Sequence, residues 1–95
     1  VVVGDSATRE IYKIANDGQA VPLTGGLIGI PTDLAYASDG TLYIADLERR
    51  AVWKMAEGQT KPEVFLPKAN ARGLAVDKEN RLWVVSQNKQ QLVRY

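Results

Sequence analysis

The sequence predicts an all-β fold assembled from a repeated unit of short antiparallel strands. Three observations predict it. Short runs rich in Val, Ile, Tyr and Trp recur along the 95 residues, and turn signals such as Asn16-Asp17-Gly18 and Ser38-Asp39-Gly40 separate them. No window carries apolar residues at helical spacing over three turns. The pattern of side-chain types also occurs three times, so the strands belong to a repeat.

The repeat is clearest around the runs that begin at Leu42 and Leu82. These two runs lie 40 positions apart and match in side-chain type. The start of the chain is an earlier copy, in which Asp5 precedes its counterpart Asp46 by 41 positions. A period of this length suits either helical repeats or propeller blades, and the strand-like spacing favours blades.

Each copy is predicted to contain up to four strands, named A to D from the inside of a blade outwards. The glycine-rich segment 24–31 suits the crossing from strand D of one blade to strand A of the next. The predicted strands are B at 1–4, C at 10–14 and D at 20–23; A at 33–37, B at 41–46, C at 51–55 and D at 63–66; and A at 73–76, B at 81–86 and C at 91–95.

The predicted fold is therefore a partial β-propeller of about two and a half four-stranded antiparallel blades. Residues 1–30 form a partial blade and crossing, 31–69 a complete blade and 70–95 a second partial blade of one domain. Both ends of the sequence fall in mid-blade, which leaves strand edges open. We expect these residues to belong to a longer chain that supplies the remaining blades, or to assemble with copies of themselves if the chain is this short.

The second copy resembles a known repeat. Pro31-Thr32-Asp33-Leu34-Ala35, then Asp39 to Asp46 and Arg50 to Lys54, resemble the NHL repeat, and they are also similar to the YWTD repeat. The resemblance implies a six-bladed propeller of the TolB-like superfamily. Its members have diverse functions, so the resemblance implies a fold and a surface more than a ligand.

Composition excludes several kinds of chemistry. The chain has no cysteine and no histidine, so it offers no disulfide, thiolate zinc site, cysteine nucleophile or histidine base. A net charge of +1 disfavours nucleic acid as a partner, and no apolar run is long enough to span a membrane. No phosphate-binding glycine loop is visible, and no cofactor is predicted. A protein or peptide is the expected partner, a small molecule stays possible, and the compartment is open.

The candidate binding face comprises the B–C loops and the D–A crossings, which share one face of a propeller. Loops on a rigid scaffold are where recognition usually occurs. Arg49 and Arg50 could bind a carboxylate or phosphate, although Arg9 and Arg50 recur in register and could instead join neighbouring blades. The candidates are Thr8, Arg9, Thr32, Asp33, Glu48, Arg49, Arg50, Arg72, Lys89 and Gln90.

Two other groups of residues have alternative interpretations. Asp5 and Asp46 could face a ligand, but a recurring aspartate at a strand end more often accepts N–H groups of its own loop. Four aromatic residues could form a stacking platform, but they alternate with aliphatic neighbours, which favours the core between blades. These residues are Tyr12, Tyr43, Trp53 and Trp83.

An enzymatic alternative follows from the same resemblance. Gluconolactonase and senescence-marker proteins share this architecture and bind a divalent cation through an Asn or Asp at the start of strand A. The matching positions here are Thr32 and Arg72, which are poor ligands for a hard cation. The residues present thus predict no metal site and no catalytic residue, although further blades could supply one. The favoured function is a non-catalytic recognition or scaffold module.

Overall fold

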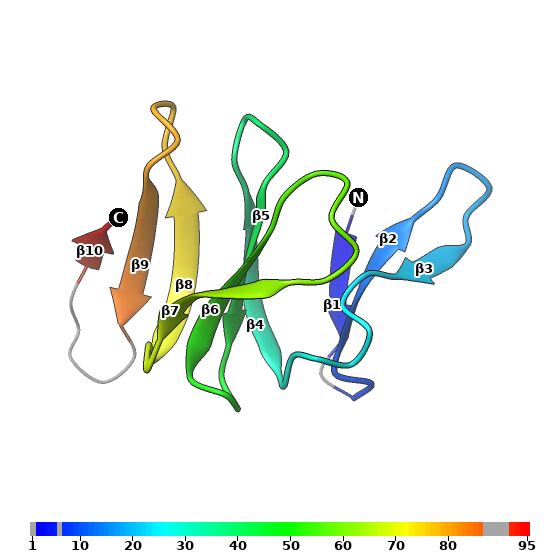
Figure 1. Cartoon of the computed structure of the whole chain (residues 1–95), viewed down its shortest axis with the longest axis horizontal. Helices are drawn as coiled ribbons and strands as arrows, with labels where there is room; N and C mark the ends of the chain where they lie inside the picture. Colours follow the sequence, from blue (N-terminus) through cyan, green and yellow to red (C-terminus); the bar gives the residue numbers. More distant parts are fainter. Residues whose placement is uncertain (1, 6, 87–91) are drawn as a thin grey trace.

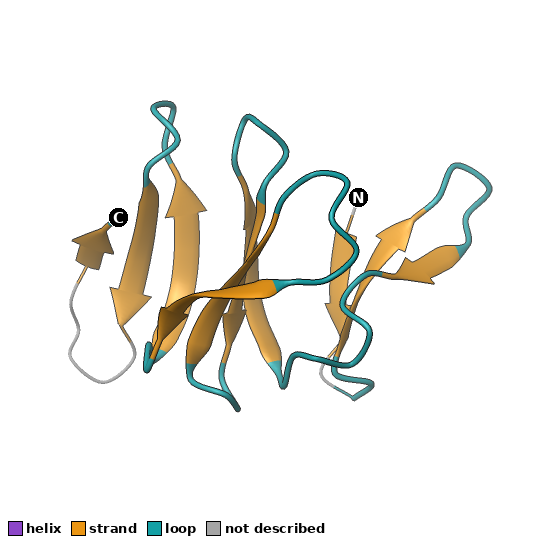
Figure 2. Ribbon diagram, in the orientation of Figure 1, coloured by secondary structure: helices purple, strands orange, loops and turns teal. Residues whose placement is uncertain are grey.

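The computed structural model describes residues 2–5, 7–86 and 92–95, which form three antiparallel sheets (Figures 1 and 2). The described residues contain strands, turns and loops and no helix, so none of them forms a helix able to cross a membrane. The N-terminal sheet comprises β1 (Val2–Asp5), β2 (Glu10–Ile14) and β3 (Ala20–Pro22). The middle sheet comprises β4 (Pro31–Tyr36), β5 (Leu42–Asp46), β6 (Ala51–Met55) and β7 (Glu63–Pro67). The C-terminal sheet comprises β8 (Ala71–Val76), β9 (Leu82–Ser86) and β10 (Leu92–Arg94).

Each sheet is an up-and-down meander in which strands adjacent in sequence are paired. The all-β prediction is confirmed, and within the described residues the ends of every predicted strand lie within two residues of those of an observed one. The main difference is that β4 and β8 begin two residues early, at Pro31 and Ala71. Pairing with the next strand continues past an irregular step at Thr32 and another at Arg72. These two β-bulges occupy the same place in two repeats, and a bulge redirects the side chains next to it.

The turns also repeat at the level of the backbone. Gly40 has φ 90° and Asn80 has φ 62°, at equivalent places in the A–B turns of two repeats. Arg9 and Arg50 likewise have φ 57° and 52° at the ends of two B–C loops. A left-handed conformation is uncommon for a residue other than glycine. The recurrence of arginine therefore marks a special backbone position of the repeat.

The sheets pack face to face through two apolar clusters, one on each side of the middle sheet. Ile44 and Ala45 are adjacent on β5, and both have 0% exposed area. Ile44 faces the N-terminal sheet, where it packs with Ile11, and Ala45 faces the C-terminal sheet, where it packs with Leu82. This period-two alternation is what a sheet covered on both faces requires.

The half-buried aromatic residues of the middle sheet belong to this packing. Tyr43 packs against the cluster shared with the C-terminal sheet and makes an edge contact with Phe65, with ring centroids 5.3 Å apart. Trp53 packs against the other cluster. Both residues lie in the core between sheets, as their alternation predicts, and do not form an open platform.

Two edges of the molecule collect the loops. The lower edge, as drawn in Figure 1, contains the B–C loops and the D–A crossings. We define it as residues 5, 7–10, 24–33, 46–50 and 67–72. The upper edge contains the A–B and C–D loops, residues 15–19, 37–41, 56–62 and 77–81. Strand direction alternates within each sheet, so these two sets of connections are separated by the length of a strand.

Candidate binding surface

The structure brings the described candidate residues together on the lower edge. Lys89 and Gln90 lie outside the described residues. Asp33 is half-buried and the others are exposed. The exposed candidates are Thr8, Arg9, Thr32, Glu48, Arg49, Arg50 and Arg72.

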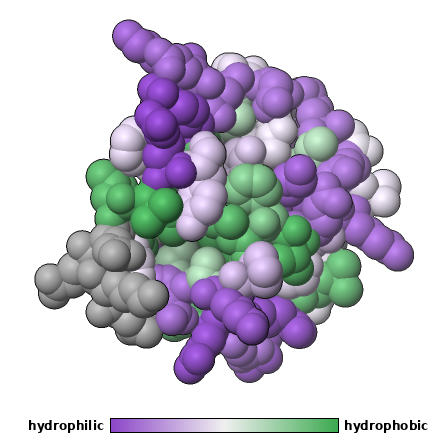
Figure 3. Space-filling model, turned by 60° about the vertical axis from the view of Figure 1, so that its left-hand side comes forward, coloured by the Kyte–Doolittle hydropathy of each residue, from purple (hydrophilic) through white to green (hydrophobic). Residues whose placement is uncertain are grey.

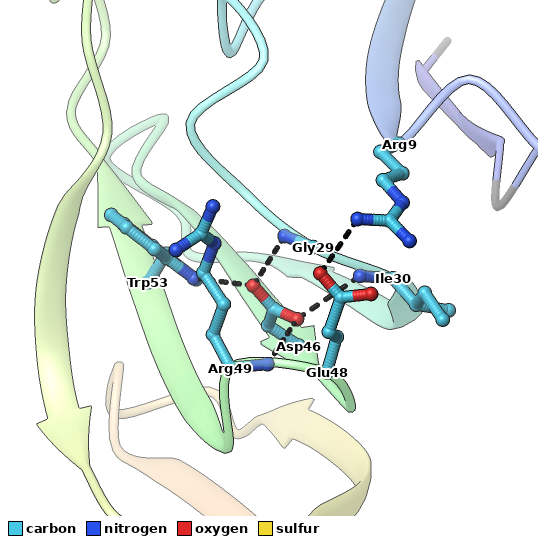
Figure 4. A network of polar contacts seen from close by, with 7 residues as sticks. All are labelled: Arg9, Gly29, Ile30, Asp46, Glu48, Arg49 and Trp53. Atoms are coloured by element: carbon cyan, nitrogen blue, oxygen red, sulfur yellow. Dashed lines mark hydrogen bonds and ion pairs between the residues drawn. The ribbon is translucent and has the colours of Figure 1, made fainter.

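Asp46, at the end of β5, organises this edge from within (Figure 4). Its side chain is almost fully buried, and the residue is 1% exposed. One carboxylate oxygen accepts hydrogen bonds from the backbone N–H of Gly29 at 2.7 Å and from Trp53 Nε1 at 2.9 Å. The other oxygen accepts the N–H groups of Ile30 and Arg49, both at 3.1 Å. Asp46 therefore holds its own loop and also the crossing that precedes β4, and it is not available to a ligand.

Asp5 occupies the equivalent position in the N-terminal sheet and has the simpler role. Its Oδ1 accepts the N–H groups of Ala7 at 2.9 Å and Thr8 at 3.4 Å. The interpretation of both aspartates as loop-holding residues is thus confirmed. Of the two, Asp46 also binds backbone N–H groups of a second segment, the crossing that precedes β4.

Glu10 is a second buried carboxylate, which sequence reasoning missed. It begins β2 and is 7% exposed. One oxygen accepts the backbone N–H of Thr24 at 2.6 Å and the Thr24 hydroxyl, and the other accepts the N–H of Gly26 at 3.0 Å. Burial raises the pKa of Glu10, but hydrogen bonds from Thr24, Gly26 and Ile11 outweigh it and bring the pKa below 4.5. A glutamate at the start of a predicted strand was the only sequence signal.

Glu10 and Asp46 together hold the glycine-rich crossing at two places. Glu10 comes from the N-terminal sheet and binds the start of the crossing, whereas Asp46 comes from the middle sheet and binds its end. Gly29 lies so close that a Cβ there would be 2.6 Å from the Glu48 Cβ. The crossing is therefore fixed by charge-assisted hydrogen bonds and by close packing.

An ion pair joins the B–C loops of two sheets. Arg9 Nη1 lies 2.8 Å from Glu48 Oε1, with side chains 55% and 35% exposed (Figure 4). The recurrence of the arginine had suggested a contact between neighbouring blades, and Arg9 makes one. Arg50, its counterpart, makes no ion pair with any described residue, but its carbonyl accepts the N–H of Ala69 at 2.8 Å. Exposed pairs of this kind contribute at most about 1 kcal/mol.

The inner strands place two further candidates in contact with backbone. Asp33 Oδ2 accepts the N–H of Leu74 on β8 at 2.8 Å, so it joins the inner strands of two sheets. The Thr32 hydroxyl donates to the carbonyl of Ala45 at 3.3 Å. Asp33 is consequently engaged, whereas Thr32 and Arg72 stay exposed at their bulges.

Four cations of the lower edge make no ion pair with any described residue. They are Arg49, Arg50, Lys68 and Arg72, and all four are exposed. Lys68 was not among the predicted candidates, although it lies between the predicted strands D and A, in a crossing that the sequence assigned to this face. It has φ 56°, a further left-handed position in this set of loops.

Among the described residues, no three acidic side chains lie close enough to hold a metal ion. A cleft of about 200 Å³ opens at the upper edge, between the N-terminal and middle sheets. Its walls include Lys13, Leu23, Tyr36, Met55 and Glu57. It is smaller than the sites that usually enclose a drug-sized molecule.

Three antiparallel meanders of three or four strands pack face to face, and the inner strands β4 and β8 are adjacent. This arrangement defines part of a β-propeller. Solved structures agree with this fold. A luciferin-regenerating enzyme has a TM-score of 0.73 and 18% identity over 90% of this chain, which corresponds to 31% of that protein. YCF48 bound to D1 peptide has a TM-score of 0.65 and 19% identity over 90% of this chain and 28% of that protein.

Both matched proteins are β-propellers, and this chain spans less than a third of the length of each. At this level of identity the likeness shows the fold alone. No family model matches the sequence. No curated protein matches it either.

Proposed function

We propose that the chain is a non-catalytic recognition module of the NHL-repeat type, which binds a protein or peptide through the lower edge. The observation that carries this proposal is a set of exposed polar side chains on loops whose backbone N–H groups are hydrogen-bonded to carboxylates of the protein. Asp46 and Glu10 fix the crossing, and Asp5 fixes the first B–C loop. Because such loops lose little conformational freedom on binding, they favour recognition.

A β-propeller can present a peptide site, as the structure of YCF48 bound to D1 peptide illustrates for that protein. Among the described residues no acidic cluster could hold a metal, and the Thr24 hydroxyl that donates to Glu10 is buried, while the loops supply guanidinium, hydroxyl and carboxylate groups. These groups suit recognition of a polypeptide.

We also propose that residues 1–30, 31–69 and 70–95 are successive blades of one domain, on which further sheets of the same repeat pack. Equivalent residues support this proposal. Val52 is 0% exposed on the middle sheet, whereas its counterpart Leu92 is 60% exposed. Ile44 is 0% exposed, and its counterpart Val3 is 46% exposed. Figure 3 shows apolar side chains gathered on the side of the molecule that carries the C-terminal sheet.

The proposed function can be tested by selecting peptides from a random display library on the purified protein. Binding of an enriched peptide is then mapped by NMR on the backbone amides. We expect the shifted amides to cluster at 31–33, 47–50 and 67–72. Shifts confined to the upper edge, at 37–41 and 56–59, would contradict the assignment of the face. A library that yields no binding peptide would overturn the proposed function itself.

A further inference from the structure

The lower edge carries an electrostatic asymmetry that the net charge of +1 conceals. Every described acidic side chain there is already engaged. Glu10 and Asp46 are buried and accept hydrogen bonds from backbone N–H groups, and Glu48 forms an ion pair with Arg9. Asp5 and Asp33 also accept backbone N–H groups. Four of these carboxylates thus accept charge-assisted hydrogen bonds from the backbone, and the fifth is in an ion pair.

Four cations of the same edge are in a different situation. Arg49, Arg50, Lys68 and Arg72 are exposed and make no ion pair with any described residue. The loop that carries Arg49 and Arg50 is joined to the turn that carries Lys68, since Ala69 donates to the carbonyl of Arg50 at 2.8 Å, and Arg72 follows that turn at the start of β8. A partner that approaches this edge therefore meets four exposed cations that are free of ion pairs with the described residues.

The upper edge provides the contrast within the same molecule. Its loops contain five acidic residues and three basic ones, and one of these bases, Arg81, is paired with Asp77 and Glu79. The acidic residues are Asp17, Asp39, Glu57, Asp77 and Glu79. The lower edge contains five acidic and five basic residues, so the two edges differ in net charge, and at the lower edge it is four exposed cations that make no ion pair with any described residue.

We infer that the segment recognised at the lower edge is an acidic stretch of polypeptide that also carries an apolar side chain, an inference that rests on the proposed function. Carboxylates of the partner would pair with Arg49, Arg50, Lys68 and Arg72, and the guanidinium forks of the three arginines suit two-oxygen acceptors. Leu47, in the same loop as Arg49, is 42% exposed and offers an apolar contact beside them.

A nucleic acid would use the same positive charge but needs more. Single strands bind by stacking their bases on exposed aromatic rings. Two aromatic side chains that contact this edge are half-buried: Trp53 donates its indole N–H to Asp46, and Tyr12 donates its hydroxyl to Thr8 at 3.1 Å. The described lower edge itself contains no aromatic residue. The pattern of cations beside an exposed leucine thus favours a polypeptide.

Fluorescence titration with two synthetic peptides tests the inference. One is a Glu-rich peptide with a central Leu, and the other replaces each Glu by Gln. We expect the Glu peptide to bind at least about tenfold more tightly, with affinity that falls between about 0.1 M and about 1 M salt because the charges are screened. The variant Arg49→Gln/Arg50→Gln is expected to lose about tenfold in affinity for the Glu peptide.

The control is Lys61→Gln/Lys78→Gln, which removes the same two positive charges from the upper edge. It should bind the Glu peptide as the parent does, and circular dichroism should show both variants folded. Equal losses in the two variants, or equal binding of the two peptides, would overturn the inference. So would stronger binding of a uridine oligonucleotide than of the Glu peptide. If neutral peptides from the display library shift lower-edge amides, the proposed peptide binding at this edge is supported, and only the inference that the partner is acidic is contradicted.

Discussion

At the scale of single residues, two equivalent aspartates show how burial changes the role of a repeated side chain. Asp5 accepts two N–H groups of its own loop, whereas Asp46 accepts three backbone N–H groups and an indole N–H. The crossing that covers Asp46 also supplies two of its partners, Gly29 and Ile30. Removing a buried acceptor leaves several donors without a partner, which costs more than losing a surface contact.

We therefore expect Asp46→Ala to lower the free energy of unfolding by about 3 kcal/mol and Asp5→Ala to lower it by about 1 kcal/mol or less. Urea denaturation followed by tryptophan fluorescence measures both values. The two positions are equivalent in the repeat, so each variant serves as the control for the other. Equal losses would mean that the contacts to the crossing add nothing to stability.

Gly29 occupies a position where close packing leaves no room for a side chain. A Cβ at this position would lie 2.6 Å from the Glu48 Cβ and 2.8 Å from Asp46 Oδ1. At Gly73 the nearest atom, Asp33 Oδ2, would be 3.7 Å away, which is an ordinary contact.

Gly29→Ala is expected to destabilise the protein by about 2 kcal/mol, because the crossing or the B–C loop must shift to admit the methyl group. Gly73→Ala should be neutral or stabilising by up to about 0.5 kcal/mol, because alanine restricts the unfolded chain. Thermal and urea unfolding of the two variants provide the comparison. A stable Gly29→Ala protein would show that the crossing can move freely.

At the scale of elements, the crossing between β3 and β4 depends on two carboxylates from different sheets. Its stability should respond to acid through Glu10. Hydrogen bonds from Thr24, Gly26 and Ile11 overcome the effect of burial and hold the pKa of Glu10 below 4.5. A carboxyl group with a lowered pKa in the folded state stabilises it above the unfolded pKa. That contribution disappears as the pH falls through the folded pKa.

We expect Glu10→Gln to be less stable than the parent at pH 7, with a difference that narrows as the pH falls below about 4.5. Urea midpoints across this pH range measure the effect. Asp77 also has a lowered pKa, because Trp83 Nε1 and backbone N–H groups bind it, so the parent loses stability in acid for more than one reason. The informative quantity is consequently the difference between variant and parent. Glu57→Gln, an exposed change on the upper edge, is the control, and a difference independent of pH would contradict the role of Glu10.

At the scale of the whole molecule, the three sheets differ in how much of each is covered. The middle sheet packs on both faces, and Ile44, Ala45 and Val52 have 0% exposed area. Every residue of β3 and of β10 is exposed. Buried strands with few routes to solvent open least often.

Hydrogen exchange should therefore be slowest for the amides of β5 and β6 and fastest for those of β3 and β10. The measurement is a time course of deuterium uptake at neutral pH, read residue by residue by NMR. Protection of β10 equal to that of β6 would mean that another sheet, from the same chain or from a second copy, covers the C-terminal sheet. Uniform weak protection would contradict the packing of the middle sheet.

The sequence alone determined the strands, their order in each sheet and the edge to which each loop belongs. These features depend on local signals, namely the period-two alternation of apolar residues, the turn residues and the repeat of 40 or 41 positions. The predicted D–A crossing at 24–31 and the loop-holding role of Asp46 depended on the same signals. The early start of β4 and β8 also has a local cause. Each strand contains a β-bulge, at Thr32 and at Arg72, which the comparison of the repeats did not reveal.

Only the tertiary structure decided which side chains meet. Glu10 and Thr24 are 14 positions apart, and Arg9 and Glu48 are 39 apart, so their contacts depend on the path of a crossing and on how two sheets pack. The same packing buries the carboxylates of the lower edge and leaves Lys68 exposed beside Arg50. A sequence of balanced charge therefore folds into a surface whose two edges differ, because burial and hydrogen bonding engage one sign of charge and leave the other in solvent.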